Sequence, residues 1–175
     1  IASKDQEKAT QLADAISSRI LKTKISNDVV GIELAAVLKN IYAIAAGICQ
    51  GLQYGDNFQA VLMSNSTKEM EVFLETIVPM ERQIAEQHYL GDMLVTSYSQ
   101  FSRNRTLGTM IGKGYSVKTA QLEMEMIAEG YYGAKCIQEL NNRFKVDMPI
   151  VDTVYKILYE KLEPRLAVRN LINFF

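Results

Sequence analysis

One long apolar segment constrains the fold of this chain more than any other feature. From about Val29 to Gln50 the residues are apolar on nearly every face of the helix that they predict, with Asn27-Asp28 as a good N-cap pair and Gly51 at the end. A helix of this kind is buried on most of its faces. Other helices must therefore surround it, which predicts a helical core built around residues 29–50.

After residue 28 the chain shows few strand signals and many helix boundaries. A second helix is expected from near Asn57 to Val78, where Pro79 breaks it. Shorter helices follow, and the last two have proline in the first turn, where a missing N–H costs little. The predicted fold class is mainly α. The later boundaries are expected at Gly91, at Gly112 and Gly114, at Glu129-Gly130, and around helices 149–161 and 164–175.

The first 27 residues predict a different arrangement. Residues 9–16 carry apolar side chains at helical spacing, and residues 21–25 alternate between apolar or β-branched side chains and lysine. One helix and one strand cannot form a domain. We therefore interpret residues 1–27 as a short α-β stub that closes an upstream α/β sheet, and residues 28–175 as a separate helical domain.

Composition excludes several classes of protein. Hydrophobic residues make up 48% of the 175 residues, and the net charge is −1 without a basic cluster, so we expect no nucleic-acid partner. The most apolar stretch, residues 41–49, is far shorter than the ~20 residues of a membrane span, and no signal peptide precedes it. Cys49 and Cys136 are interpreted as reduced core residues of a cytoplasmic protein. With His88 as the single histidine, no metal site is expected.

Lys39 is the most informative single residue, because it lies in the middle of the apolar helix. A lysine there must extend to solvent, pair with an acid, or have its pKa lowered by desolvation. A lowered pKa is what proton transfer near neutral pH requires. The alternative is a lysine that reaches solvent through a gap in the packing, and helix composition alone leaves both interpretations open.

A second group of polar residues follows further along the chain. Asp92, after Gly91, could line a site or simply cap a helix. The turn Ser102-Arg103-Asn104-Arg105 joins a hydroxyl, two guanidiniums and an amide, which suit phosphate oxygens at a helix start, although a solvated basic turn would have the same sequence. Glu129 could accept hydrogen bonds from a ribose or merely begin a helix. No phosphate-binding glycine-rich turn is present, so a nucleotide would need one upstream.

Taken in order, these segments resemble the C-terminal region of NAD(P)-dependent glycerol-3-phosphate dehydrogenases. The resemblance covers roughly residues 1–150 and is most specific where the Leu-Lys-Asn helix and the Ser-Arg-Asn-Arg turn occur together with Gly-Asp between them. The matching segments are residues 30–47, Gly55-Asp-Asn57, Leu90-Gly-Asp92 with Thr96, Ser102-Arg-Asn-Arg105 and Glu129-Gly130.

The resemblance implies a two-domain enzyme whose helical C-terminal domain is of the 6-phosphogluconate-dehydrogenase-like type and follows a Rossmann domain. The implied reaction is hydride transfer between NAD or NADP and dihydroxyacetone phosphate, giving sn-glycerol 3-phosphate for phospholipid synthesis. The substrate is thus a small phosphorylated molecule, and the active site lies between the domains. Without the Rossmann domain, residues 1–175 alone are expected to be inactive.

The resemblance also implies a role for each matching residue. Lys39 would be the catalytic proton donor and acceptor, and Asp92 would line the substrate site and orient the lysine. Arg103 would bind substrate phosphate and border the nucleotide. The other substrate-binding residues implied are Asn40, Thr96, Ser102 and Asn104, and the other cofactor-binding residues are Ile127 and Glu129.

The chain departs from the family pattern at three places: His88-Tyr89-Leu90 stands where the family has a more glycine-rich approach to Gly-Asp, Ala128 replaces a larger aliphatic residue, and the tail after Lys161 matches no pattern. Two other hypotheses remain at this point. One is a related two-domain dehydrogenase that acts on another hydroxy acid, and the other is a non-catalytic helical binding module. The choice between NADH and NADPH lies in residues upstream of Ile1, and the apolar tail 171–175 leaves room for a homodimer.

Overall fold

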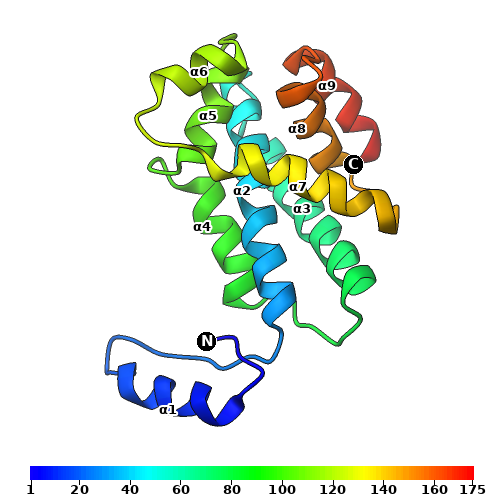
Figure 1. Ribbon diagram of the computed structural model, residues 1–175. Helices are drawn as coiled ribbons and strands as arrows, with labels where there is room; N and C mark the ends of the chain where they lie inside the picture. The colour runs from blue at the N-terminus through cyan, green and yellow to red at the C-terminus, as the bar shows by residue number, and fades with distance from the viewer.

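The computed structural model describes all 175 residues and consists entirely of helices and connecting segments (Figure 1). It contains nine α-helices, one π-helical turn and one terminal 3-10 turn, so the predicted mainly α fold class is confirmed. The α-helices are α1 (Gln6–Ile16), α2 (Val29–Gly51), α3 (Asp56–Ile77), α4 (Asp92–Tyr98), α5 (Arg103–Gly112), α6 (Val117–Glu123), α7 (Glu129–Phe144), α8 (Pro149–Tyr159) and α9 (Pro164–Leu171); the π-turn is Gln87–Gly91 and the 3-10 turn Ile172–Phe174.

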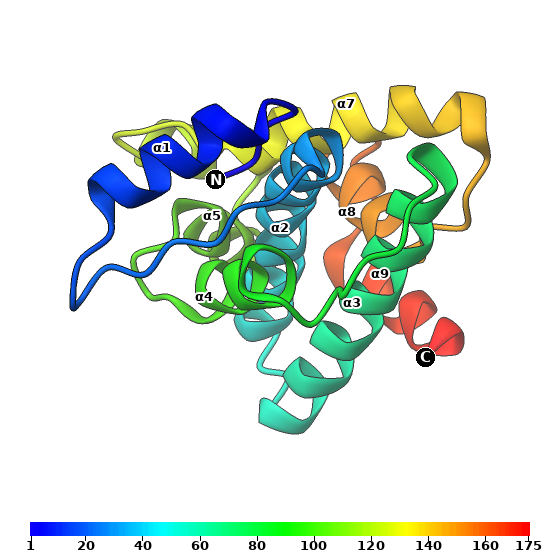
Figure 2. The same ribbon diagram turned by 90° about the horizontal axis from the view of Figure 1, so that it is seen from below.

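Helix α2 is the centre of the molecule, as its apolar sequence predicts. Figures 1 and 2 show α4 and α5 on one side of it and α3, α8 and α9 on the other, while α7 crosses its face. Leu38, Ile41, Ile44 and Ile48 are fully or almost fully buried. By length and composition alone α2 would also suit a membrane span, but half of its most apolar window is buried in the helical core. Its hydropathy is therefore explained by packing.

The closest helix–helix contact joins α2 and α5, and glycines make it possible. A Cβ atom at Gly47 would collide with the backbone oxygen of Arg105, and one at Gly108 would collide with that of Ile44. Gly51 and Gly112 meet in the same way at the ends of the two helices. This contact explains the small residues of α2 as helix packing and brings the start of α5 close to the middle of α2.

The N-terminal residues form a helix but no strand, so the predicted α-β stub is wrong in its β part. Helix α1 stands apart from the other helices, and residues 17–28 return alongside it (Figure 1). The only β pairing is an isolated bridge between Ala2 and Ser26. A strand requires a neighbouring strand along its length, and residues 21–25 have none in this chain, so alternation in the sequence does not become a strand.

The two cysteines have different environments. Cys49 is buried in α2, where burial raises the pKa of its thiol to about 12, which confirms the predicted core position. Cys136 lies on the outer face of α7 and is exposed, so the prediction that it belongs to the core is wrong. Helix α7 is amphipathic, and its inward face is taken by Gly130, Ala134 and Ile137.

Helices α8 and α9 close the core at the C-terminal end. The carboxylate of Glu69 on α3 accepts hydrogen bonds from the backbone N–H groups of Ile150 (2.8 Å) and Val151 (3.1 Å) at the start of α8. In the apolar tail, Leu171 belongs to the core, whereas Ile172, Phe174 and Phe175 are at least partly exposed, and the ring of Phe175 lies beside Phe58.

Candidate active site

The structure brings Lys39 and Asp92 together from two different helices. The Nζ atom of Lys39, in the middle of α2, donates to Oδ2 of Asp92, the first residue of α4, at 2.6 Å. The two side chains are 21% and 42% exposed, so neither is sealed in the core. The sequence left three possibilities for this lysine: extension to solvent, pairing with an acid, or a pKa lowered by desolvation. The structure shows pairing with an acid. An ammonium has three N–H groups, so Lys39 keeps donors for a further partner.

The backbone of Asp92 is fixed on both sides. Its N–H group donates to the carbonyl oxygens of Gln87 and Tyr89 in the π-turn. Its own carbonyl oxygen accepts from Thr96 Oγ1 at 2.7 Å. The departure from the family pattern at His88-Tyr89-Leu90 therefore lies in the turn that delivers Asp92. Thr96 lies one turn beyond Asp92, and its hydroxyl is already bonded to backbone there.

A second set of hydrogen bonds connects α2, α5 and α7. The side-chain Nδ2 of Asn104 donates to Oδ1 of Asn40 at 2.9 Å, and its Oδ1 accepts from the backbone N–H of Gly130 at 2.8 Å. Asn104 is buried. A Cβ atom at Gly130 would approach the carbonyl oxygen of Asn40 to 2.6 Å. Glycine is therefore required where the start of α7 rests on α2.

Each of the three residues joined by this connection follows a charged residue in the chain. Lys39 precedes Asn40, Arg103 precedes Asn104, and Glu129 precedes Gly130. Arg103 and Glu129 are the first residues of α5 and α7, are exposed, and take part in none of the ion pairs of the chain. The hydrogen bonds of Asn104 therefore bring the backbone positions of Lys39, Arg103 and Glu129 near one another, and the guanidinium of Arg103 has no acid partner.

The other predicted site residues have more varied surroundings. Ser102 is the N-cap of α5, and its Oγ accepts from the N–H of Arg105 at 3.3 Å. Arg105 itself donates to the carbonyl oxygen of Tyr98 at 2.6 Å, which ties α5 to the end of α4. Ile127 is 63% exposed in the segment before α7. Among the predicted site residues, direct side-chain hydrogen bonds thus join Lys39 to Asp92 and Asn104 to Asn40.

Sequence reasoning missed a buried ionic cluster formed by Asp28, Arg82 and Tyr89. Arg82 donates to Asp28 through Nε (2.5 Å) and Nη2 (3.2 Å), and the Tyr89 hydroxyl donates to Asp28 Oδ2 at 2.5 Å. Burial would raise the pKa of Asp28, but hydrogen bonds from Arg82, Tyr89 and the N–H of Gly31 outweigh it and lower that pKa. Asp28 carried an N-cap signal, whereas Arg82 and Tyr89 lie far along the chain and had none.

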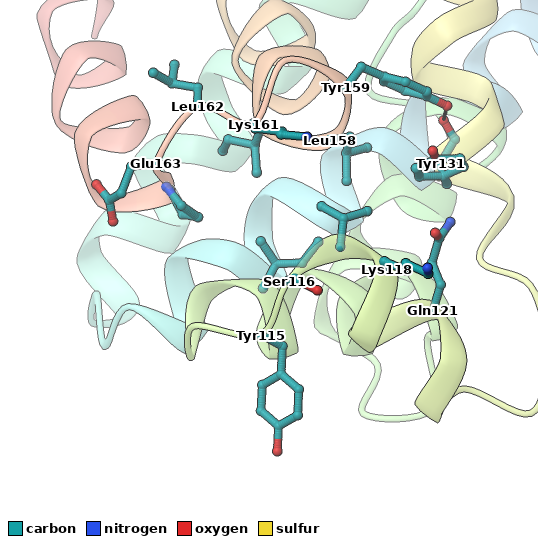
Figure 3. A pocket seen from close by; sticks show the side chains of 14 residues that line it. Tyr115, Ser116, Lys118, Gln121, Tyr131, Leu158, Tyr159, Lys161, Leu162 and Glu163 are labelled. Atoms are coloured by element: carbon teal, nitrogen blue, oxygen red, sulfur yellow. Dashed lines mark hydrogen bonds between the residues drawn. The ribbon is translucent and has the colours of Figure 1, made fainter.

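A separate cleft of about 530 Å³ opens between the α5–α6 turn and the α8–α9 turn (Figure 3). Its floor is mainly apolar, with Leu158 and Leu162, and Tyr131 and Tyr159 form one wall, with Tyr159 Oη donating to the carbonyl oxygen of Tyr131. Tyr115 points away from it. None of the predicted site residues lines this cleft, so its volume alone does not mark the site.

Comparisons with known proteins agree on one family. Residues 28–169 match the family model described as NAD-dependent glycerol-3-phosphate dehydrogenase C-terminus. A glycerol-3-phosphate dehydrogenase [NAD(P)+] of Clostridium botulinum is 36% identical over 172 residues, which are 98% of this chain and 52% of that protein. The chain therefore spans about half the length of the curated relatives that it matches.

Solved structures show the same fold. The crystal structure of glycerol-3-phosphate dehydrogenase from Coxiella burnetii superposes with a TM-score of 0.93 at 30% identity, covering 98% of this chain and 53% of that one. A glycerol-3-phosphate dehydrogenase from Saccharomyces cerevisiae gives a TM-score of 0.83 at 22% identity, covering 93% and 48%. The second likeness concerns the fold alone.

Proposed function

The chain belongs to the NAD-dependent glycerol-3-phosphate dehydrogenase family, of which it represents the C-terminal domain, and from this premise we propose that it is the substrate-binding half of an enzyme. The proposed enzyme interconverts sn-glycerol 3-phosphate and dihydroxyacetone phosphate. The observation that carries the proposal is the ion pair between Lys39 and Asp92, which is half-open to solvent.

In the proposed reaction Lys39 transfers the proton. During reduction its ammonium donates a proton to the carbonyl oxygen at C2 of dihydroxyacetone phosphate, and during oxidation the neutral amine takes the proton of the C2 hydroxyl. Asp92, at 2.6 Å from Nζ, holds the lysine side chain and balances its charge. One N–H group of the Lys39 ammonium donates to Oδ2 of Asp92. This contact fixes the orientation of the ammonium, and its other two N–H groups are left for the substrate.

Arg103 is proposed to bind the phosphate of the substrate. Its guanidinium is exposed at the first residue of α5, where backbone N–H groups at the helix start add to the attraction for an anion. Ser102 caps the same helix end. Asn40, Asn104 and Thr96 are assigned to the edge of the substrate site, where Asn104 fixes α5 to α2 and α7.

A bound nicotinamide coenzyme, NAD or NADP, would supply the hydride in its reduced form and accept it in its oxidised form. The chain's own residues suit part of its site: Glu129 presents an exposed carboxylate at the start of α7 and Ile127 an exposed apolar side chain, with Arg103 on the neighbouring helix start. A carboxylate can accept hydrogen bonds from hydroxyl groups, and an aliphatic side chain can cover a ring. Most of the coenzyme would contact the upstream domain.

We place this enzyme in the cytoplasm, where it would supply glycerol 3-phosphate for phospholipid synthesis. Two free cysteines agree with a reducing compartment. A homodimer is also proposed, through the partly exposed tail residues Ile172, Phe174 and Phe175. Leu171 is not available to such an interface because it is in the core.

The proposal is tested by substituting Lys39 in the full-length protein that contains this chain. Lys39→Met nearly keeps the volume of the side chain and removes the ammonium, so turnover of dihydroxyacetone phosphate with NADH or NADPH should fall by about 10²–10⁴-fold. The matched control is Lys135→Met, at an exposed lysine of α7, which should keep the wild-type rate. Equal rates for the two variants, or a wild-type protein without this activity, would overturn the proposal.

A further inference from the structure

The segment that leads to Asp92 has almost no regular structure of its own. Between the end of α3 at Ile77 and the π-turn at Gln87 the chain forms no helix and no strand. A segment of this kind is not held by a ladder of backbone hydrogen bonds, so its position depends on side-chain anchors. Asp92 follows the π-turn that continues this segment, so its position depends on the side chains that anchor the segment and the turn.

Two buried side chains, Arg82 of this segment and Tyr89 of the π-turn that follows it, are anchors that reach the same carboxylate. Arg82 and Tyr89 donate three hydrogen bonds to Asp28, and the N–H of Gly31 donates a fourth at 2.9 Å. The side chains of Arg82 and Asp28 are only 3% and 5% exposed. Arg82 also donates to the carbonyl oxygen of Val78 at 2.8 Å, which closes the segment on itself. The Asp28 carboxylate therefore accepts four hydrogen bonds.

The anchor is connected directly to the backbone of the acid. The carbonyl oxygen of Tyr89 accepts from the N–H of Asp92, so the residue whose hydroxyl is fixed on Asp28 also holds the first amide of α4. Movement of the Tyr89 ring would therefore displace the backbone from which the Asp92 carboxylate extends to Lys39.

The same cluster also fixes the other partner of the pair. Asp28 is the N-cap of α2, and Lys39 follows 39 − 28 = 11 residues later on that helix. Eleven residues are close to three turns, about 16 Å, so Lys39 projects from the same side of α2 as its N-cap. One carboxylate thus sets both the start of the helix that carries the lysine and the segment that carries the acid.

We infer that Arg82 and Tyr89, held on Asp28, are positioning residues that keep Asp92 in contact with Lys39. This inference rests on the proposed function for its catalytic consequence, but its structural part concerns Asp92 alone. The side chains of Arg82 and Tyr89 hydrogen-bond to Asp28 and Val78, and not to the side chains of Lys39 or Asp92. Their effect reaches the reaction only through the placement of the acid and the lysine.

Tyr89→Phe is the sharpest test, because it removes one hydroxyl and keeps the ring. The matched control is Tyr159→Phe, which also removes a hydroxyl bonded at 2.7 Å but lies on α8. In the 175-residue chain, amide exchange at Asp92 should become at least tenfold faster in Tyr89→Phe and should be unchanged in Tyr159→Phe. If the Tyr89 hydroxyl contributed only to overall stability, both variants would be destabilised and amide exchange at Asp92 would not differ between them.

In the full-length enzyme, Tyr89→Phe should lower kcat by at least tenfold, towards the ~100-fold that a misplacement of about 1 Å can cost, while KM for dihydroxyacetone phosphate stays the same. Tyr159→Phe should retain the wild-type kcat. Arg82→Lys, which keeps the charge but loses the two-pronged contact, should resemble Tyr89→Phe.

The outcomes separate this inference from the proposed function. Unchanged exchange at Asp92 in Tyr89→Phe, or equal kcat losses in the two tyrosine variants, overturns the positioning role even when Lys39→Met abolishes turnover. If the wild-type enzyme does not turn over dihydroxyacetone phosphate, the proposed function fails, and amide exchange at Asp92 still decides whether Tyr89 positions it.

Discussion

Helix α2 takes part in two acid–base pairs whose distances are nearly equal and whose surroundings are opposite. At its start Asp28 meets Arg82 at 2.5 Å, with the two side chains 5% and 3% exposed. In its middle Lys39 meets Asp92 at 2.6 Å, with side chains 21% and 42% exposed. The first pair also bonds to Tyr89 and Gly31, whereas the second has no further side-chain partner.

The difference distinguishes a structural pair from the pair that we propose to be catalytic. A short contact between opposite charges occurs in both places, so distance does not distinguish them. The Asp28 carboxylate has four donors and no room for another, and such a group serves stability and placement. Lys39 has donors to spare and faces solvent, and those are the requirements for contact with a substrate.

The largest expected effect comes from breaking the sealed pair. Arg82→Met leaves the Asp28 carboxylate buried without its cation, so the free energy of unfolding of the chain should fall by about 3–5 kcal/mol. Asp92→Asn, at the half-open pair, should cost about 1 kcal/mol or less, because exposed pairs contribute little. Urea unfolding of both variants measures the two values.

The contrast between the two pairs is wrong if Arg82→Met and Asp92→Asn lower the free energy of unfolding by the same amount. It would also fail if Arg82→Met proved neutral, since that would mean that water or another cation replaces the guanidinium around Asp28. Activity provides the complementary measurement: Asp92→Asn should lose turnover in the full-length protein while its stability stays near that of wild type.

A second way to break the sealed pair leaves both charges in place. A Cβ atom at Gly31 would lie on the carboxylate of Asp28, and a side chain must then push that group away from its donors. Gly31→Ala should therefore destabilise the chain by about 1–3 kcal/mol, as overpacking does in a dense core, although alanine favours the helix.

The control for this substitution is Gly55→Ala. Gly55 precedes α3, has an ordinary negative φ, and a Cβ atom there would meet nothing within 4 Å. Its cost should stay within the few tenths to about 1 kcal/mol of a changed N-cap. If Gly31→Ala were as mild as Gly55→Ala, the Asp28 cluster would be more adaptable than its hydrogen bonds indicate.

Much of this fold follows from local sequence, as α2 illustrates. Its predicted span from Val29 to Gln50 differs from the observed Val29–Gly51 by one residue, because apolar periodicity, an N-cap aspartate and a terminal glycine all act within a few residues. Helices α8 and α9 begin at their prolines for the same reason. Local signals were sufficient wherever the structure depends on local chemistry.

What the sequence could not provide depends on contacts between distant residues. Arg82 and Tyr89 reach Asp28 across 54 and 61 positions, and no spacing within the chain indicates that these three meet. Residues 21–25 alternate like a strand but have no partner strand in this chain, and pairing is a property of two segments. The outward position of Cys136 likewise depends on which face of α7 packs on α2.

Glu69 is a second buried carboxylate, and unlike Asp28 it has no cation as a partner. Burial raises its pKa from 4.5 to about 8, although the N–H groups of Ile150 and Val151 act in the opposite direction. The folded state then holds a proton that the unfolded state releases, so stability decreases as pH rises through this window. For Asp28 the pKa is lowered, and stability is lost instead as pH falls below its ordinary range.

Urea unfolding at about pH 5 and about pH 8 tests this difference. The wild-type chain should lose up to about 1.4 kcal/mol per pH unit relative to Glu69→Gln, which keeps an acceptor for α8 but has no proton to release. A wild-type chain that parallels Glu69→Gln across this range would show that Glu69 is ionised when folded, and that a helix start can replace a cation around a buried carboxylate.

The smallest effect is expected at a third pair, Lys24 with Glu86, whose contact distance equals that of the Lys39–Asp92 pair. Its Nζ–Oε1 contact is 2.6 Å, the same as for Lys39 and Asp92, but the lysine is 61% exposed. Water and salt screen such a pair, with a Debye length of about 8 Å at physiological ionic strength. Lys24→Met should therefore leave both the urea midpoint and kcat of the full-length protein at wild-type values, whereas Lys39→Met should abolish most of kcat.

Equal losses of kcat in Lys24→Met and Lys39→Met would contradict this expectation. They would mean that the reaction requires only a short contact between a lysine and an acid. The free N–H groups of the lysine and the surroundings of the pair would then not distinguish the pairs.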